Sequence, residues 1–146
     1  MEIDIPTRDY ICRHRVARLA TADGAGRPSV IPICYVFDGS SIYSPIDRKP
    51  KSVAAQRLKR IRNIEENGNV SLVIDDYSDD WDKLAYVQVS GTAEVIEPER
   101  DREAEHRRAV TMLRDKYAQY RSMDIDRRPM IKITPTRLKV WRAKPA

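Results

Sequence analysis

The longest regular pattern in the sequence is "LAYVQVSGTAEVIE", residues 84–97, in which apolar side chains occupy every second position. An alternation of this kind is typical of a β-strand with one buried face, because successive side chains of a strand point to opposite faces of the sheet. Glycine inside a strand commonly marks a bulge, so we expect one at Gly91. The segment predicts one long, half-buried strand.

Shorter strand patterns surround this segment. Asp38 and Gly39 separate two of them and form a strong hairpin signal. Pro28 and Pro32 cannot donate to a strand ladder, so their strand is expected at a sheet edge or at a bulge. The last two patterns meet at Pro135. The expected strands cover residues 16–22, 28–37, 40–46, 69–76, 84–97, 130–134 and 137–141.

Helical patterns occupy three other segments, residues 6–15, 52–64 and 98–120. The seven strand segments are expected to form roughly six strands, which come in adjacent antiparallel pairs instead of alternating with helices. This order favours a mainly β fold, a six-stranded antiparallel split β-barrel with helices packed outside it.

Composition limits the class of protein. The 146 residues fit a single domain, 1–146, and 41% of them are hydrophobic against 34% charged. The longest apolar run, "VIPICYVF", is too short for a membrane span, and the acidic, polar start does not resemble a secretory signal. We therefore expect a cytoplasmic protein without a membrane partner. Its two Cys and two His residues show no metal-ligand spacing, so no metal site is expected.

Positive charge is concentrated in the segment "DRKPKSVAAQRLKRIRNI", residues 47–64. It holds seven of the 27 Lys and Arg residues and one of the 22 Asp and Glu residues, whereas the whole chain carries a net charge of only +5. A solvated helix usually mixes the two signs to gain ion pairs, and here the cations stand uncompensated. The segment predicts a basic amphipathic helix with an anionic partner.

That partner could be a nucleic acid backbone or a small phosphorylated ligand. Nucleic acid binding is the weaker interpretation, because no aromatic residue that could stack on bases lies between Tyr43 and Tyr77. For a small anion, we expect Lys51 and the start of the helix to hold the phosphate while Arg57 and Arg60 reach it from the side.

The order of these segments resembles the pyridoxamine 5′-phosphate oxidase-like superfamily of FMN- and F420-binding split barrels. The resemblance runs from "RLATADGAGRPSVIPICYVFDGSSIYSPID" through the basic segment to "YVQVSGTAEVIE", and "RLKVWRA" agrees as well. "DRKPK", "RLKRIRNI" and "DDYSDDW" are similar to the branch of probable F420-dependent oxidoreductases.

The resemblance implies roles for particular residues. Arg60 matches the phosphate-binding cation of the family, and Asn63 matches the asparagine that follows it. Pro32, Ile33 and Cys34 lie on the strand along which the flavin ring rests in the family. Ser44 matches a hydroxyl residue that binds the phosphate end of the cofactor in the family. Two aromatic residues, Tyr86 and Trp141, are further candidates for cofactor contact.

Tyr86 stands where the vitamin B6 oxidases have Gln, and the substrate residues of those enzymes are not recognisable, so pyridoxamine phosphate is a poor substrate candidate. Trp141 either walls the ring pocket, in its own or a neighbouring subunit, or packs as a core or dimer anchor.

The function expected from the resemblance is an F420-dependent oxidoreductase that transfers a hydride between the deazaflavin and a small-molecule acceptor, with the catalytic residues unassigned. FMN is the alternative cofactor, and a non-catalytic flavin- or tetrapyrrole-binding protein is the alternative function. Family members close the cofactor groove with a second subunit, which implies a homodimer. A continuous helix from Ser52 to Arg62 would span roughly 15 Å and could follow the acidic tail of F420, which favours F420 over FMN.

Overall fold

The structure is a computed structural model that describes residues 1–47, 58–99 and 102–144. Its helices are α1 (Ile5–Arg13), α2 (Lys59–Glu66) and α3 (Glu103–Lys116), with short 3-10 helices η2 (Trp81–Lys83) and η4 (Ala118–Ser122). Its strands are β1 (Ala17–Ala22), β2 (Pro28–Ile33), β3 (Val36–Phe37), β4 (Ile42–Pro45), β5 (Asn69–Asp76), β6 (Ala85–Ile96) and β7 (Met130–Arg142).

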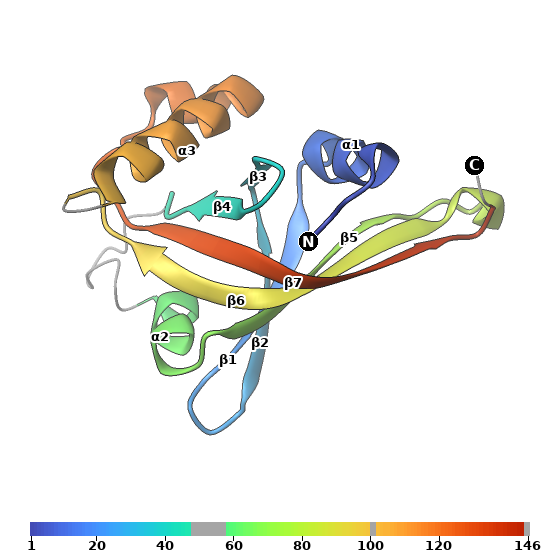
Figure 1. The fold of residues 1–146 in the computed structure, drawn as a ribbon, viewed down its shortest axis with the longest axis horizontal. Coiled ribbons are helices and arrows are strands. Elements are labelled where there is room, and N and C mark those ends of the chain that lie inside the picture. Colours follow the sequence, from blue (N-terminus) through green and yellow to red (C-terminus); the bar gives the residue numbers. More distant parts are fainter. Residues whose placement is uncertain (48–57, 100–101, 145–146) are drawn as a thin grey trace.

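The seven described strands form one antiparallel sheet in the order β2-β1-β5-β6-β7-β4-β3, which curls into a half-barrel (Figure 1). This confirms the expected mainly β, split-barrel fold, although the count is seven strands and not six. The segment 28–37 is interrupted at Cys34 and Tyr35 and gives two strands, whereas the two patterns around Pro135 join into the single strand β7.

The prolines of β2 explain its place at the edge of the sheet. Pro28 and Pro32 both lie on β2, which pairs only with β1 among the described strands. Because a proline nitrogen carries no hydrogen, an edge is where such a strand is tolerated. The edge strand expected from the sequence is confirmed.

Gly91 lies at a close approach of β6 and β7. Its partner is Pro135, while Ser90 pairs with Arg137, so Thr136 is an extra residue on β7 and forms a bulge. A Cβ atom at position 91 would lie 2.3 Å from the carbonyl oxygen of Thr134. Only glycine fits this contact, and the expected irregularity at Gly91 is confirmed.

Helices cover the sheet on both sides. Figure 1 shows α1 and α3 on one side of the long strands β6 and β7, and α2 on the other. Apolar side chains form two buried clusters, one around Leu19, Ile42 and Ile74 and one between α3 and strands β3 and β4. None of the described helices is long and apolar enough to cross a membrane.

The basic helix is shorter than expected. Leu58 has an extended backbone, with φ −60° and ψ 141°, so α2 begins at Lys59 and ends before Asn67. The expected continuous helix from Ser52 to Arg62 is therefore wrong, because the extended residue interrupts it. Residues 48–57, which include Lys51 and Arg57, lie outside the described residues.

Candidate functional site

A cavity of about 400 Å³ lies where the edge strand β2 approaches β4. Five residues singled out in the sequence line it together, namely Pro32, Ile33, Cys34, Ser44 and Arg60. They come from three elements, the end of β2, strand β4 and helix α2. The remaining lining residues are Val16, Ile31, Pro45 and Asp47.

Ser44 ties the two sides of this cavity together. Its hydroxyl donates a hydrogen bond of 2.8 Å to the carbonyl oxygen of Cys34, just beyond β2, and its side chain is buried. A hydroxyl has only one proton to donate. Ser44 could donate to a phosphate only after turning away from Cys34, so in this arrangement it shapes the cavity wall.

Arg60 is held at the cavity by the packing of α2. Ile61 and Ile64, on the same helix, are buried at 0% and 4% exposure and attach α2 to the barrel core. Arg60 is only partly exposed. A guanidinium on an anchored helix is a ready partner for a phosphate or carboxylate, which it can bind through two parallel hydrogen bonds.

Asp47 brings a negative charge to the same cavity. Its carboxylate accepts a hydrogen bond of 2.8 Å from the hydroxyl of Tyr120, which is buried in η4. Burial, followed by this hydrogen bond, raises the pKa of Tyr120 well above its usual value. Tyr120 therefore stays protonated and keeps donating to Asp47 over the whole physiological pH range.

A polar network lies behind the cavity wall at the junction of β2 and β3. The amide of Tyr35 donates to the hydroxyl oxygen of Tyr117 at 3.1 Å, and that hydroxyl donates to the carbonyl of Arg15 at 2.8 Å. Lys116 Nζ donates to the carbonyl of Tyr35 at 3.0 Å and lies 4.1 Å from the centre of its ring. Burial lowers the pKa of Lys116 to about 8. The junction is thus fixed by side chains from α3 and its C-terminal end.

Asn63 does not line the cavity. Its side-chain amide donates to the hydroxyl of Thr21 at 3.0 Å, and both residues are buried. In this structure Asn63 attaches α2 to β1, which places Arg60 indirectly.

Tyr86 and Trp141 lie elsewhere on the sheet. They are register partners on β6 and β7, and their rings stack at 5.7 Å with an interplanar angle of 24°. Pro32, at the cavity, pairs with Arg18 on β1, which pairs with Val73 on β5, which in turn pairs with Gln88 on β6. Gln88 lies two residues from Tyr86 on the same strand, so three strand spacings separate the cavity from the strand of Tyr86. Three strand spacings are roughly 14 Å. Within one chain, the aromatic pair is therefore remote from the cavity.

Sequence reasoning missed four lining residues, and Asp47 is the most consequential of them. Its place at the start of the basic segment, directly after "YSPI", was the available signal, but the sequence assigned Asp47 no role. Val16, Ile31 and Pro45 are apolar and carried no signal apart from their neighbours in the sequence.

The cavity combines an apolar wall with very few ionisable groups. Among the described residues that line it, only Cys34, Asp47 and Arg60 can ionise. No acid–base pair or activated nucleophile can be built from these three as they stand. Such a site is suited to holding a mainly apolar molecule with one anionic end, and a bound cofactor would have to supply any chemistry.

Comparison with known proteins places the chain in a family. The family profile described as "Pyridoxamine 5′-phosphate oxidase" matches residues 5–142. No curated protein matches the sequence significantly.

Solved structures share the fold at low sequence identity. A conserved hypothetical protein of Mycobacterium tuberculosis aligns with a TM-score of 0.75 and 22% identity, over 99% of this chain and 87% of the other. The haem storage protein HutZ of Vibrio cholerae aligns with a TM-score of 0.69 and 15% identity, over 97% and 95%. An F420 reductase aligns with a TM-score of 0.67 and 19% identity, over 94% and 98%. At these identities the likeness concerns the fold alone.

Proposed function

Because this chain belongs to the pyridoxamine 5′-phosphate oxidase family, we propose that it is an oxidoreductase that binds coenzyme F420 in the cavity between β2 and β4. FMN is the alternative cofactor. The observation that carries the proposal is the meeting, in one cavity, of Arg60 with the apolar end of β2.

The residues present fit such a cofactor. The cavity volume of about 400 Å³ falls within the range of small-molecule sites. Arg60 supplies the cation for a phosphate, and Pro32 and Ile33 supply an apolar surface for a planar ring. A bound flavin or deazaflavin would supply the hydride chemistry, which no side chain of the cavity can provide.

The work of the protein is then to bind, orient and exclude water. Arg60 would fix the anionic end of the cofactor, and the wall formed by Ile31, Pro32 and Ile33 would set the plane of its ring. The bond from Ser44 to Cys34 keeps the two cavity walls at a fixed separation. The acceptor is a small molecule that must reach the exposed face of the ring.

The preference for F420 rests on sequence and fold likeness. A single continuous basic helix along the tail of F420 does not support it, since α2 begins at Lys59. What supports F420 is the similarity of "DRKPK" and "DDYSDDW" to the F420-dependent branch, together with the fold shared with an F420 reductase.

We also propose that the protein is a homodimer. Trp141 and Val30 are 43% and 63% exposed and, by strand register, lie on the same outer face of the sheet as Tyr86 and Pro32. A second copy would cover this face and could bring its Tyr86 and Trp141 to the cavity. Light scattering of the purified protein should give the mass of a dimer, and a monomer at micromolar concentration would contradict this part of the proposal.

The proposed function is tested by titrating the purified protein with F420 and FMN and following absorbance and fluorescence. We expect saturable binding of both with F420 the tighter. The loaded protein, reduced by a separate F420-reducing enzyme, should be reoxidised when a suitable acceptor is added. Failure to bind either cofactor would overturn the proposal.

A cofactor or tetrapyrrole carrier is the second candidate, and the fold shared with the haem storage protein favours it. Stable binding without acceptor-dependent reoxidation across a panel of quinones and other planar acceptors would support this alternative. Haemin titration followed by its Soret band separates a tetrapyrrole carrier from a flavin carrier.

A further inference from the structure

Asp47 is the only acidic residue among the described residues that line the cavity. An anion beside the proposed site of an anionic cofactor needs an explanation, because like charges repel and a partly buried carboxylate loses solvation. It is the first residue of the basic segment, and its carboxylate accepts a hydrogen bond from the side chain of Tyr120. Among the described residues, the hydrogen bond from Tyr120 fixes the position of this carboxylate.

Tyr120 holds this carboxylate firmly. The tyrosine is 3% exposed, and its ring packs edge-on against Tyr117 with 5.4 Å between the ring centres. Its hydroxyl donates to Oδ2 of Asp47 at 2.8 Å. Across the described ranges, Tyr120 is the only hydrogen-bond partner of the Asp47 side chain, and its bond occupies Oδ2.

The chemistry of this group selects among ligands. An ionised carboxylate accepts hydrogen bonds and donates none, so it favours a ligand with an O–H or N–H group and disfavours a second anion. Flavins and deazaflavins carry hydroxyls on their ribityl chain and an N–H on their ring. At its periphery, a haem-type tetrapyrrole carries only carboxylates as polar groups and offers no donor there for Asp47.

We propose that Asp47 is a specificity-determining residue, which accepts a hydrogen bond from the ribityl hydroxyls or ring N–H of a flavin-type cofactor and disfavours metal tetrapyrroles. This inference rests on the proposed function and deepens it. The cavity would then orient its ligand, with the anionic end of the ligand at Arg60 and one of the ligand's hydrogen-bond donors at Asp47.

The test uses riboflavin as its main probe, because riboflavin keeps the hydroxyls and the ring but has no phosphate for Asp47 to repel. In the full-length protein, Asp47→Ala should weaken riboflavin binding by about tenfold to hundredfold, the effect of losing a hydrogen bond to a charged group. Haemin, followed by its Soret band, should bind the variant at least about threefold more tightly than the wild type, because a like charge has been removed.

Two further arms locate the contact. Lumiflavin has the ring N–H without the ribityl chain, so a loss limited to riboflavin assigns the contact to the hydroxyls, and a loss with both probes assigns it to the ring. Tyr120→Phe keeps the charge but releases the carboxylate, and it should weaken riboflavin binding by a smaller factor than Asp47→Ala. Asp115→Ala, an exposed aspartate on α3, is the charge-matched control and should bind like the wild type.

The outcomes separate the two proposals. If the wild type binds riboflavin and Asp47→Ala binds it equally well, with an unchanged melting temperature, this inference is overturned while the proposed function stands. If the wild type binds haemin but no flavin or F420, both are overturned. A weaker haemin affinity in Asp47→Ala would contradict the discrimination against tetrapyrroles.

Discussion

The polar side chains on the two faces of strand β4 lie in different surroundings, one face packed against α3 and the other lining the cavity. Tyr43 and Ser44 are adjacent, and because strand side chains alternate, they point to opposite faces. Tyr43 faces α3, where its hydroxyl donates to Glu105 at 2.5 Å, and Lys132 donates to the same carboxylate oxygen at 2.6 Å. Ser44 faces the cavity, where Asp47 and Arg60 also lie.

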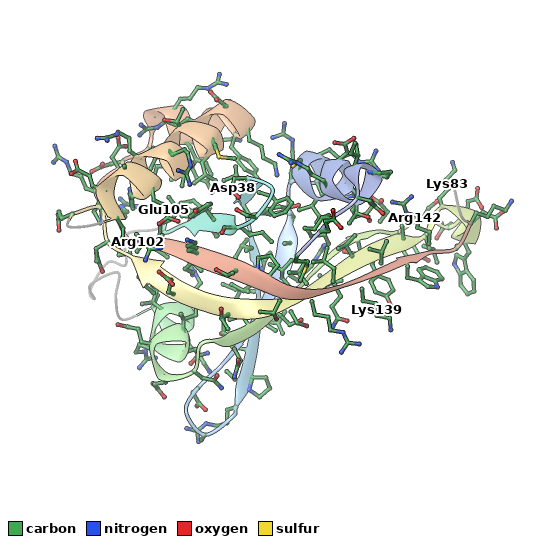
Figure 2. The ribbon with its side chains drawn as sticks, viewed as in Figure 1. Asp38, Lys83, Arg102, Glu105, Lys139 and Arg142 are labelled. Carbon is green, nitrogen blue, oxygen red and sulfur yellow. The ribbon has the colours of Figure 1, made fainter. Side chains whose placement is uncertain are left out.

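The α3 face forms a closed network. Arg102 donates to Glu105 at 2.7 Å and also pairs with Glu94, which links the start of α3 to β6, and Figure 2 shows Arg102 and Glu105 together at this end of the sheet. Each charged group here has a protein partner, so the network contributes to stability. The cavity face carries Arg60 and Asp47, the two charged groups that the proposed cofactor would contact. The comparison therefore predicts that mutations on one face change stability and mutations on the other change binding.

The largest expected effect is on stability, from Glu105→Gln. The substitution removes the charge that Arg102, Lys132 and Tyr43 share, and removing one member of a partly buried ion-pair network should lower the free energy of unfolding by about 2 to 4 kcal/mol. Urea unfolding followed by circular dichroism measures it. Glu103→Gln, an exposed residue 3.7 Å from Arg107, is the control and should cost less than about 0.5 kcal/mol. A loss below 1 kcal/mol for Glu105→Gln, or a loss of cofactor affinity as large as that of Arg60→Ala, would contradict the comparison.

The next effect is on binding, from Arg60→Ala. Losing a charge-assisted contact to the cofactor phosphate should weaken F420 or FMN binding by about 1.5 to 3 kcal/mol, while unfolding changes little because α2 is anchored by Ile61 and Ile64. Fluorescence titration measures the affinity. Arg107→Ala, an exposed arginine on α3, removes the same charge and should leave the affinity unchanged. Equal losses in the two variants would mean that net charge and not position governs binding.

The third prediction concerns the stability of the protein at acidic pH. Burial alone would raise the pKa of Glu105, but hydrogen bonds from Arg102, Lys132 and Tyr43 outweigh it and lower the pKa from 4.5 to about 2. A carboxyl whose pKa is lower in the folded state binds more protons when unfolded. Its stabilisation is therefore complete above about pH 5 and is lost as the pH falls toward 2.

We accordingly expect the stability difference between wild type and Glu105→Gln to shrink by about 1 to 3 kcal/mol between pH 5 and pH 2, as measured by urea unfolding at each pH. Cofactor-site variants should show a pH-independent difference over the same range. If the difference in unfolding free energy between wild type and Glu105→Gln stays constant from pH 5 to pH 2, the charge of the Glu105 carboxylate does not contribute to the stability of the network.

The smallest expected effect is on stability at alkaline pH and concerns Lys116, behind the cavity wall. Burial lowers its pKa to about 8 from 10.5, so between these values the unfolded chain binds more protons and the contribution of Lys116 to stability rises with pH. Relative to Lys116→Met, the wild type should gain about 1 to 2 kcal/mol from pH 8 to 10, a value reduced from the full pKa shift because the side chain is partly exposed.

Thermal unfolding at fixed ionic strength would follow this trend. The comparison stops at pH 10, because burial raises the pKa of tyrosines such as Tyr35 and Tyr117, and stability falls with pH once they would ionise in the unfolded chain. Parallel curves for the two proteins between pH 8 and 10 would contradict the burial of the ammonium group.

Local sequence signals determined the sheet. Pro28 and Pro32 specify an edge strand because they lack a backbone donor. Gly91 permits a close approach of β6 and β7 because no Cβ fits there. Asp38-Gly39 gives a hairpin because Gly39 has φ of 99°. Each property depends on the residue itself and its neighbours. The split barrel could therefore be predicted, as could the meeting of strand β2 with helix α2 through the family resemblance.

Only the tertiary structure decided which polar groups share a space. Asn63, expected at the site, bonds to Thr21 in the interior, whereas Asp47, which the sequence did not suggest, lines the cavity because Tyr120, 73 positions away, holds it there. The helical pattern over residues 52–64 suggested one long helix, yet an extended backbone at Leu58 starts α2 at Lys59. Alternation and turn chemistry act over a few residues and can be read along the chain, but the contacts that define this cavity join segments whose separation in sequence says nothing of their distance in space.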